Sequence, residues 1–375
     1  MEKRKWYNKN ITTSLLGFGA MRLKTINGEI DEEKGFALFD KAYQNGVNYF
    51  DTAMPYTDGK NETFVGKALK RYPRESFYLA TKCSLFMFKT KDDFLNVMDR
   101  QLKALQTEYI DFYLLHAMNK DKFKLIKEWN VMEQLEKWKE EGKIRYIGFS
   151  FHDDYATFKE ILDYYPWDFC QIQLNYMDQD IQQGIKGYYD LEKKKIPVII
   201  MEPLKGGKLA HFNKDIAKNF TDYNKNASLA SWALRWLGSL EGVKVILSGM
   251  NEDDQLVDNL NVFNEFRKMD VEELEIVEKV RMQIKNSTKV DCTACKYCMP
   301  CPKGVNIAGN FRIYNNYGMY EDINEARSGV ESLKKNDSYA DKCVKCGLCL
   351  SKCPQSIKIP NELENMMNDF KRVLK

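Results

Sequence analysis

The stretch DEEKGFALFDKAYQNGVNYFDTA, residues 31–53, joins a segment of helical period to a short apolar run. The segment begins at Asp31, a residue type that caps helices, and stops at Gly46, as helix ends tend to. The run NYFDTA (48–53) that follows is short and apolar, which is typical of a buried strand. Whether this helix-and-strand unit recurs along the chain decides the fold.

The unit recurs from residue 14 to about residue 266, where short apolar runs alternate with segments of helical period such as 91–106, 131–143 and 226–240. Eight runs rich in Val, Ile, Leu and Phe are strand candidates: residues 14–21, 48–53, 77–82, 110–117, 144–150, 169–175, 196–204 and 243–249. Eight such strands, each followed by a helix, predict an α/β fold of the parallel (β/α)₈ TIM-barrel type. A doubly wound open sheet is the alternative, but GFGAM (17–21) does not supply the GxGxxG turn that it requires.

Two further helices are expected after the eighth strand, at residues 251–266 and 271–286. The second leads to Cys292 without a Gly-, Ser- or Pro-rich tether, so we expect the cysteine-rich end to dock on the barrel. The predicted division is a barrel over residues 1–270 and a small helical domain over residues 271–375.

The composition indicates an ordinary globular protein, since 44% of the 375 residues are hydrophobic and 30% are charged. With 57 basic and 54 acidic residues, the net charge of +3 gives no reason to expect a nucleic-acid partner. The N-terminal stretch lacks the apolar core of a signal peptide, and no apolar run is long enough to span a membrane. We therefore expect a cytoplasmic protein with no membrane partner.

Four polar side chains lie at or just beyond the C-terminal ends of successive strand candidates. Asp51 ends the second strand, Tyr56 follows it in the loop, Lys82 ends the third strand and His116 ends the fourth. Each has an ordinary structural explanation by itself, as a turn, packing or core residue. In a (β/α)₈ barrel, however, these strand ends meet at one mouth, so together they predict a catalytic site.

At these residues the chain resembles the aldo-keto reductase family. The matching segments are FDTAMPYTDGKNETFVGKAL (50–69), LATK (79–82), YLLHA (113–117), YIGFS (146–150) and IPVIIMEPLKGG (196–207), and the resemblance spans nearly all of residues 14–265. It implies that Tyr56 is the general acid that protonates a small carbonyl substrate, or the base that deprotonates an alcohol. Lys82 would lower the pKa of that phenol, Asp51 would pair with Lys82, and His116 would orient the carbonyl.

The resemblance also implies a nicotinamide cofactor, NADH or NADPH, which supplies the hydride. Ser150 and Gln171 match the residues that hold the carboxamide, and Asp258 and Asn259 match residues that face the adenine. The complete set of implied cofactor contacts is Ser150, Gln171, Met201, Pro203, Leu204, Gly206, Gln255, Asp258 and Asn259.

The chain departs from the family pattern around the cofactor at Met201, Gly249 and Gln255. Met201 stands where a Tyr usually stacks on the nicotinamide, and the basic residues that bind the 2′-phosphate of NADPH fall at Gly249 and Gln255. Because an Arg clamp makes a bidentate, charge-assisted contact, its loss predicts that NADH is used at least as well as NADPH.

Eight of the ten cysteines form two arrays within the last 84 residues: Cys292, Cys295, Cys298 and Cys301, then Cys343, Cys346, Cys349 and Cys353. The second array matches the bacterial ferredoxin spacing, and the first differs only in the gap before its last cysteine. Two [4Fe–4S] clusters are predicted, with thiolate-bound zinc as the alternative. Cys83 and Cys170 lie inside strand candidates and are expected to be core thiols.

The arrangement of ligands follows from two-cluster ferredoxins, in which the fourth cysteine of each array binds the other cluster. Cys353 is then expected to join the first three cysteines of the first array, and Cys301 the first three of the second. One array per cluster stays open as an alternative. The 41 residues between the arrays are helical in pattern, so the module resembles alpha-helical ferredoxins.

The leading functional hypothesis is an iron–sulfur-containing aldo-keto reductase whose clusters exchange electrons with a redox partner such as a ferredoxin. A second hypothesis keeps the reductase but makes the clusters structural or part of a docking surface. A third makes the barrel a binding scaffold for an electron-transfer protein. Hydride transfer moves two electrons, whereas a [4Fe–4S] cluster moves one. The sequence therefore does not indicate how electrons would pass between the nicotinamide site in the barrel and the clusters in the C-terminal domain.

Overall fold

The computed structural model describes residues 1–7 and 9–374. The chain divides into two compact units, each treated separately below. The first comprises residues 1–206 and 230–271, and the second comprises residues 207–229 and 272–375. Residues 207–229 lie within the range expected for the barrel, but they group with the residues that follow 271.

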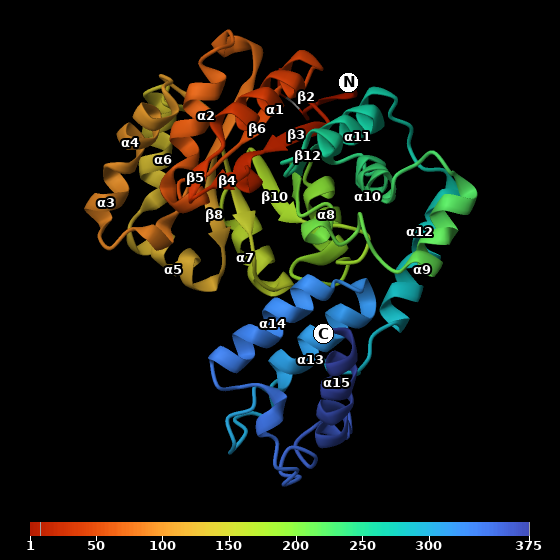
Figure 1. Ribbon diagram of the computed structural model, residues 1–375. Helices are drawn as coiled ribbons and strands as arrows, with labels where there is room; N and C mark the ends of the chain where they lie inside the picture. The colour runs from red at the N-terminus through yellow and green to blue at the C-terminus, as the bar shows by residue number, and fades with distance from the viewer. Residues whose placement is uncertain (8, 375) are drawn as a thin grey trace. The chain divides into compact units, whose positions relative to one another are not determined.

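The first unit is a closed barrel of eight parallel strands, which confirms the predicted fold class (Figure 1). Each of the eight strand candidates matches one barrel strand, although β7, β8 and β9 end one residue later than expected. The strands are β3 (Leu16–Gly19), β6 (Tyr49–Asp51), β7 (Tyr78–Cys83), β8 (Ile110–Met118), β9 (Ile144–Phe151), β10 (Phe169–Gln173), β11 (Val198–Met201) and β12 (Val243–Ser248). The strands follow one another around the barrel in sequence order, and β12 pairs with β3 to close it.

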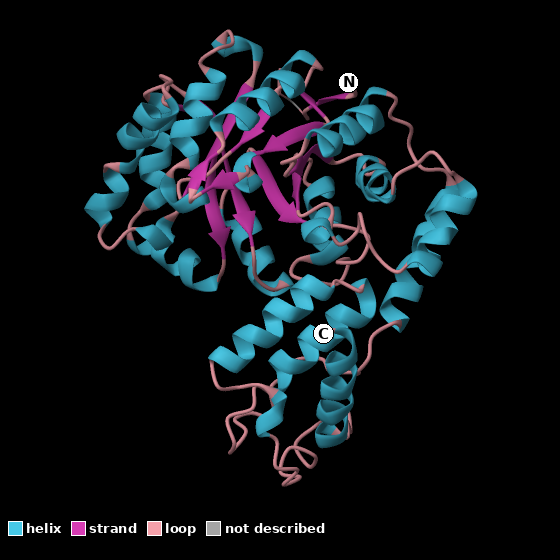
Figure 2. Cartoon of the chain, in the orientation of Figure 1, coloured by secondary structure: helices cyan, strands magenta, loops and turns pink. Residues whose placement is uncertain are grey.

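Helices surround the strands on the outside, as the cyan ribbons of Figure 2 show. They are α1 (Glu32–Gln44), α2 (Asn61–Leu69), α3 (Lys91–Leu95), α4 (Val97–Leu105), α5 (Lys120–Glu128), α6 (Val131–Glu140), α7 (Tyr155–Tyr164), α8 (Gly184–Lys193), α10 (Leu229–Gly238) and α11 (Asp253–Asn264). Asp31 accepts a hydrogen bond from the amide of Lys34 and so caps α1, as its residue type predicts. The expected helix over residues 91–106 is two helices, α3 and α4, because the chain is interrupted at Asn96.

Aromatic side chains fill one end of the barrel interior. Trp6 follows β1 (Lys3–Lys5), which pairs with β2 (Thr12–Ser14), and it packs against Phe112 with ring centroids 4.8 Å apart. Phe112 also meets Phe169 edge to face at 5.1 Å. Phe112 and Phe169 lie toward the N-terminal ends of β8 and β10, so the opposite end is left for polar residues.

The second unit is helical in the residues described. Its helices are α9 (Lys214–Tyr223), α12 (Val271–Asn286), α13 (Ile307–Tyr320), α14 (Ile323–Lys335) and α15 (Ile359–Val373). Phe311, Val330, Leu363 and Phe370 contribute to one buried apolar cluster that joins α13, α14 and α15. The sequence patterns predicted α12, α13 and α14, whereas α15 was not singled out.

The remaining short elements are the hairpin β4 (Thr25–Ile26) and β5 (Glu29–Ile30) and six 3₁₀ turns. The turns are η1 (Ala20–Arg22), η2 (Tyr56–Gly59), η3 (Arg74–Ser76), η4 (Leu85–Met87), η5 (Lys205–Gly207) and η6 (Ala340–Lys342).

Within residues 1–7 and 9–374, no helix has both the length and the apolar character needed to cross a lipid bilayer.

Candidate active site and cysteine module

A buried ion pair lies at the C-terminal ends of β6 and β7. The Nζ atom of Lys82 donates to Oδ1 of Asp51 at 2.6 Å and to the carbonyl oxygen of Thr52 at 2.8 Å. The Lys82 side chain is 0% exposed and that of Asp51 is 4% exposed. Burial opposes the charge on Lys82, but attraction to Asp51 and then to Tyr56 outweighs it and raises the Lys82 pKa. Lys82 is therefore held as an ammonium ion inside the barrel mouth.

Tyr56 starts the turn η2, directly after β6 and its loop. Thr57 and Asp58 adopt left-handed backbone conformations (φ 49° and 52°), which turn the chain sharply after Tyr56. The Lys82 ammonium lies 4.9 Å from the centre of the Tyr56 ring. Burial raises the pKa of Tyr56 and Lys82 lowers it, and the net effect is an increase. The expected net decrease in this pKa is therefore not found, because desolvation exceeds the effect of the cation.

His116 lies near the end of β8, with its ring centroid 6.0 Å from that of Tyr56. Burial, reinforced by the positive charges of Lys82 and Lys122, lowers the pKa of His116 to about 2. The imidazole is therefore neutral over the whole physiological range. Phe86 covers another side of the ring, with centroids 5.4 Å apart.

Ser84 is a contributor to this site that the sequence reasoning missed. Its Oγ lies 2.6 Å from Nδ1 of His116, and the Ser84 side chain is fully buried. A hydroxyl has one proton to donate, and among the described residues Nδ1 is its hydrogen-bond partner. Donation from Ser84 to Nδ1 satisfies that proton and leaves the hydrogen of the neutral ring on Nε2. The signal in the sequence is only a serine two residues after Lys82.

The two residues expected to hold a carboxamide are neighbours across paired strands, since Gln171 of β10 lies opposite Ser150 of β9. The Ser150 oxygen accepts a hydrogen bond from the amide of Ala117 at 2.7 Å, so its own proton is available to a ligand. The Gln171 amide nitrogen lies 3.5 Å from the sulfur of Met201, and its oxygen is buried without a partner among the described residues. A donor and an acceptor thus lie side by side, as a primary carboxamide requires.

The other expected cofactor contacts lie after β11 and on α11. Pro203, Leu204 and Gly206 follow β11, and Gly206 has a positive φ of 68° that favours glycine. Asp258 and Asn259 lie on α11, where Asn259 is buried and donates to the Ser248 hydroxyl at 2.8 Å. The side-chain oxygen of Gln255 accepts from the backbone amide of Asn251 at 3.0 Å. Gln255 and Asn259 therefore already make contacts within the first unit.

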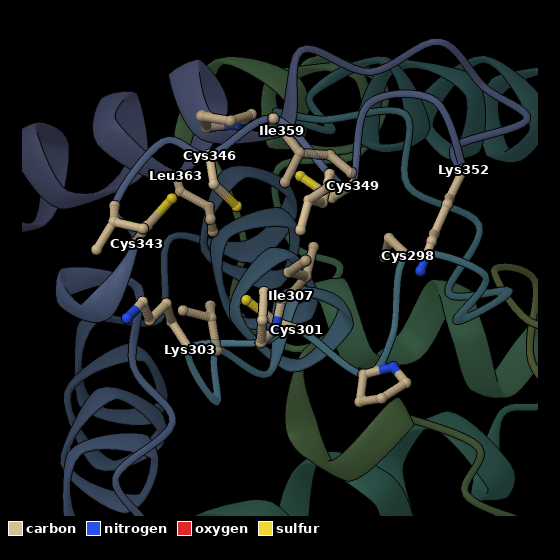
Figure 3. A pocket seen from close by; sticks show the side chains of 17 residues that line it. Cys298, Cys301, Lys303, Ile307, Cys343, Cys346, Cys349, Lys352, Ile359 and Leu363 are labelled. Atoms are coloured by element: carbon tan, nitrogen blue, oxygen red, sulfur yellow. The ribbon is translucent and has the colours of Figure 1, made fainter.

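The eight array cysteines line two hollows in the second unit. The larger, with a volume of about 300 Å³, is lined by Cys301, Cys343, Cys346 and Cys349 together with Cys298. Figure 3 shows the first four arranged around this hollow, with Cys298 to one side. Most of the rest of its wall is apolar and includes Val305 and Leu363, while Lys303 and Lys352 also line it.

The smaller hollow, about 20 Å³, is lined by Cys292, Cys295, Cys298 and Cys353. Ile307 and Ile359 line both hollows, and Cys298 reaches both. Among the described residues, no three Cys, His, Asp or Glu side chains converge closely enough for a single metal ion. A four-iron cluster is larger than one ion and holds its four thiolates farther apart. Two sets of four thiols with apolar walls suit such clusters.

Comparison with known protein families gives two matches. Residues 15–281 match the aldo/keto reductase family, and residues 291–357 match the 4Fe-4S dicluster domain. The first match covers most of the chain and includes every barrel strand. These matches confirm both the aldo-keto reductase resemblance and the iron–sulfur domain predicted at the C-terminal end.

Individual relatives match mainly over the barrel. L-galactose dehydrogenase of Arabidopsis thaliana is 27% identical over 77% of this chain and 97% of its own length. NADH-specific methylglyoxal reductase of Escherichia coli (strain K12) is 26% identical over 68% of this chain and 91% of its own length. Among solved structures, the holo form of a Bacillus halodurans aldo-keto reductase superposes with a TM-score of 0.63 at 28% identity, covering 75% of this chain and 96% of that one.

The contact between Ser84 and His116 predicts the tautomer of the histidine. In the wild type, nitrogen-15 NMR of the three histidines is expected to show a protonated Nε2 and an unprotonated Nδ1 for His116. Replacement Ser84→Ala is expected to allow both tautomers, while Ser84→Thr, which keeps the hydroxyl, should preserve the wild-type pattern. His152 and His211 serve as internal references, and an Nδ1-protonated His116 in the wild type would contradict the assignment.

Proposed function

Because the chain belongs to the aldo/keto reductase family, we propose that its barrel interconverts a small carbonyl compound and the corresponding alcohol with NADH or NADPH. The observation that carries the proposal is the buried Lys82–Asp51 pair beside Tyr56 and His116. When bound, the nicotinamide supplies or accepts the hydride. The chain's own residues have to bind the carbonyl and move one proton.

In the reducing direction, the neutral Nε2–H of His116 donates a hydrogen bond to the carbonyl oxygen. Tyr56 gives its phenolic proton to the same oxygen as hydride arrives at the carbon, so the product is a neutral alcohol. The raised pKa of Tyr56 keeps this proton in place until that step. An alkoxide is a stronger base than a phenolate, so the transfer is still favourable, and Lys82 stabilises the phenolate that remains.

Replacement of Tyr56 by Phe tests this assignment. Loss of the proton donor should lower kcat/KM for reduction of methylglyoxal, used as a small carbonyl probe, by about 100-fold or more. Binding of NADH should stay within about twofold, because the ring remains. The matched control is Tyr189→Phe, which alters an exposed tyrosine. Near-normal turnover by Tyr56→Phe would refute the proposed role.

The pair Ser150 and Gln171 is proposed to hold the carboxamide of the cofactor, and Met201 to pack against the ring. The unpaired Gln171 oxygen and the available Ser150 proton support this assignment. Pro203, Leu204 and Gly206 are proposed to follow the cofactor along the loop after β11, and Gln255, Asp258 and Asn259 to lie near its adenosine end.

NADH is proposed to bind at least as well as NADPH. The start of α11 carries three successive carboxylates, Glu252, Asp253 and Asp254, next to Gln255. Glu252 pairs with Lys24 and Lys34, and Asp253 pairs with Lys41, so these nearby cations are already engaged. A 2′-phosphate in this region meets acidic side chains and no arginine from α11. The name of the Escherichia coli relative is consistent with this preference.

Dissociation constants for both cofactors test the preference. We expect NADH to bind at least as tightly as NADPH, whereas a 100-fold preference for NADPH, about 2.7 kcal/mol, would contradict the proposal. Replacement Gln255→Arg should improve NADPH binding by about tenfold and leave NADH nearly unchanged, because it restores a charge-assisted contact. Gln283→Arg adds the same charge to α12 of the second unit and is the control.

For the second unit we propose two [4Fe–4S] clusters with crossed ligands. Cys292, Cys295, Cys298 and Cys353 hold one cluster, while Cys343, Cys346, Cys349 and Cys301 hold the other. The proposal is supported by the lining of the two hollows, because each contains three cysteines of one array and the last of the other. The clusters are proposed to exchange single electrons with a partner protein. We also propose a cytoplasmic location, because iron–sulfur clusters require a reducing environment.

Removal of one set of ligands distinguishes the two arrangements. Replacement of Cys343, Cys346 and Cys349 by Ala should leave one cluster with about four irons per chain. Adding Cys353→Ala to this variant should abolish the remaining cluster, while adding Cys301→Ala should leave iron content and EPR amplitude unchanged. The opposite pattern would establish one array per cluster.

A further inference from the structure

The two cysteine loops carry an unusual distribution of charge. Residues 292–303 and 342–358, here called the cluster face, contain six lysines and no acidic residue. Elsewhere in residues 272–375 there are 11 basic and 14 acidic residues. The positive charge of the second unit's C-terminal part is therefore concentrated where the cysteines are. The lysines are Lys296, Lys303, Lys342, Lys345, Lys352 and Lys358.

Most of these lysines are available for a partner. Lys345 pairs with Glu364 at 2.8 Å and Lys342 pairs with Asp337. The other four, Lys296, Lys303, Lys352 and Lys358, are exposed and form no ion pair with any residue that the structure describes. Four uncompensated cations on one short stretch of surface favour an anionic partner.

Apolar side chains are exposed on the same face. Tyr297 is 68% exposed, Val344 and Leu348 are each 58% exposed, and Leu350 is 44% exposed. Single exposed apolar residues are common, but four of them among uncompensated charges resemble the apolar centre and charged rim of a protein interface.

This face also covers the larger hollow. Val344, Leu348, Lys303 and Lys352 line it together with its five cysteines. In Figure 3, Lys303 and Lys352 lie on opposite sides of that hollow. A protein resting on these residues is therefore separated from the cluster site by single side chains. Electron tunnelling falls off steeply with distance, so this is the part of the module best suited to exchange.

We propose that the cluster face is the docking site for a small electron-carrier protein with an acidic surface. The proposal rests on the proposed cluster binding and names the partner's chemistry. In each encounter the reduced carrier loses one electron and one cluster gains it, or the reverse, with no change in covalent bonds. The lysines steer the carrier toward the face, and Val344 and Leu348 provide its apolar centre.

A structural explanation for the lysines is that they offset the negative charge of clusters ligated by four thiolates. That role acts on cluster potential and assembly and requires no partner. A docking role acts on association with an acidic protein and weakens as salt screens the charges. Loss of the lysines should therefore change the cluster potential if their role is structural, and the rate of association with an acidic protein if their role is docking.

The test uses the reconstituted full chain and two protein probes, a reduced acidic two-[4Fe–4S] ferredoxin as donor and basic cytochrome c as acceptor. Stopped-flow reduction by the ferredoxin should slow by about tenfold as ionic strength rises from about 0.02 to 0.3 M. The variant Lys303→Gln/Lys352→Gln should lower the low-salt rate by about tenfold as well. The control Lys279→Gln/Lys335→Gln removes the same charge from exposed positions on α12 and α14 and should change the rate less than twofold.

Binding without electron transfer gives an independent readout. Zero-length carbodiimide cross-linking of the complex should join carboxylates of the ferredoxin to lysines of the cluster face, as peptide mapping can establish. Cross-links spread equally over Lys279 and Lys335 would overturn the proposal. Replacement Leu350→Ser, at an exposed residue that lines neither hollow, should reduce cross-linking yield by about threefold or more while the EPR spectrum of the clusters is retained.

Four other results separate the docking site from the redox role. Equal rates for the two double variants would overturn docking at this face, as would a change in cluster potential large enough to explain the slower rate. Fast exchange with cytochrome c and none with the ferredoxin would overturn the acidic partner while preserving the redox role. Clusters that dithionite reduces but neither protein oxidises or reduces would reject electron exchange itself.

Discussion

The active site depends on one buried charge. Lys82 has no exposed surface, and an ammonium ion in such a place is tolerated only when it is paired and hydrogen-bonded. Asp51 and the carbonyl of Thr52 meet that requirement from the neighbouring strand, so the pairing of β6 with β7 has to bring their C-terminal ends together. Removal of one partner from a buried pair typically costs about 3–5 kcal/mol, so the charge is also a structural constraint.

Burial also keeps the two groups beside this cation, His116 and Tyr56, uncharged. Burial and the Lys82 charge remove the proton from His116, while burial keeps the proton on Tyr56. One fixed cation therefore stands beside a phenol and an imidazole that can both donate hydrogen bonds. The Ser84 hydroxyl lies 2.6 Å from Nδ1 of His116, and its donation to that atom is predicted to leave the ring hydrogen on Nε2. In an aldo/keto reductase barrel, this combination suits a substrate that gains negative charge on oxygen during the reaction.

The chain leads directly from the proposed cofactor loop into the second unit. The loop after β11, where cofactor contacts are proposed, ends at Gly206, and Gly207 begins the segment that belongs to the second unit. Both glycines have positive φ angles, 68° and 97°. Within the second unit, Lys208 pairs with Glu325 at 2.9 Å and Asn213 donates to Glu321 at 2.8 Å. The polypeptide thus passes from the proposed cofactor loop to a segment of the second unit within two residues, through backbone that only glycine adopts easily.

The sequence by itself determined the barrel, the strand-end positions of Asp51, Lys82 and His116, and the dicluster character of the C-terminal arrays. These features follow from local period and spacing, and parallel strands necessarily bring their C-terminal ends to one mouth. Only the tertiary structure identified Ser84 as the partner of His116, raised the Tyr56 pKa and grouped residues 207–229 with the second unit. Desolvation and contacts between distant segments decide each of these, and neither leaves a periodic pattern in the chain.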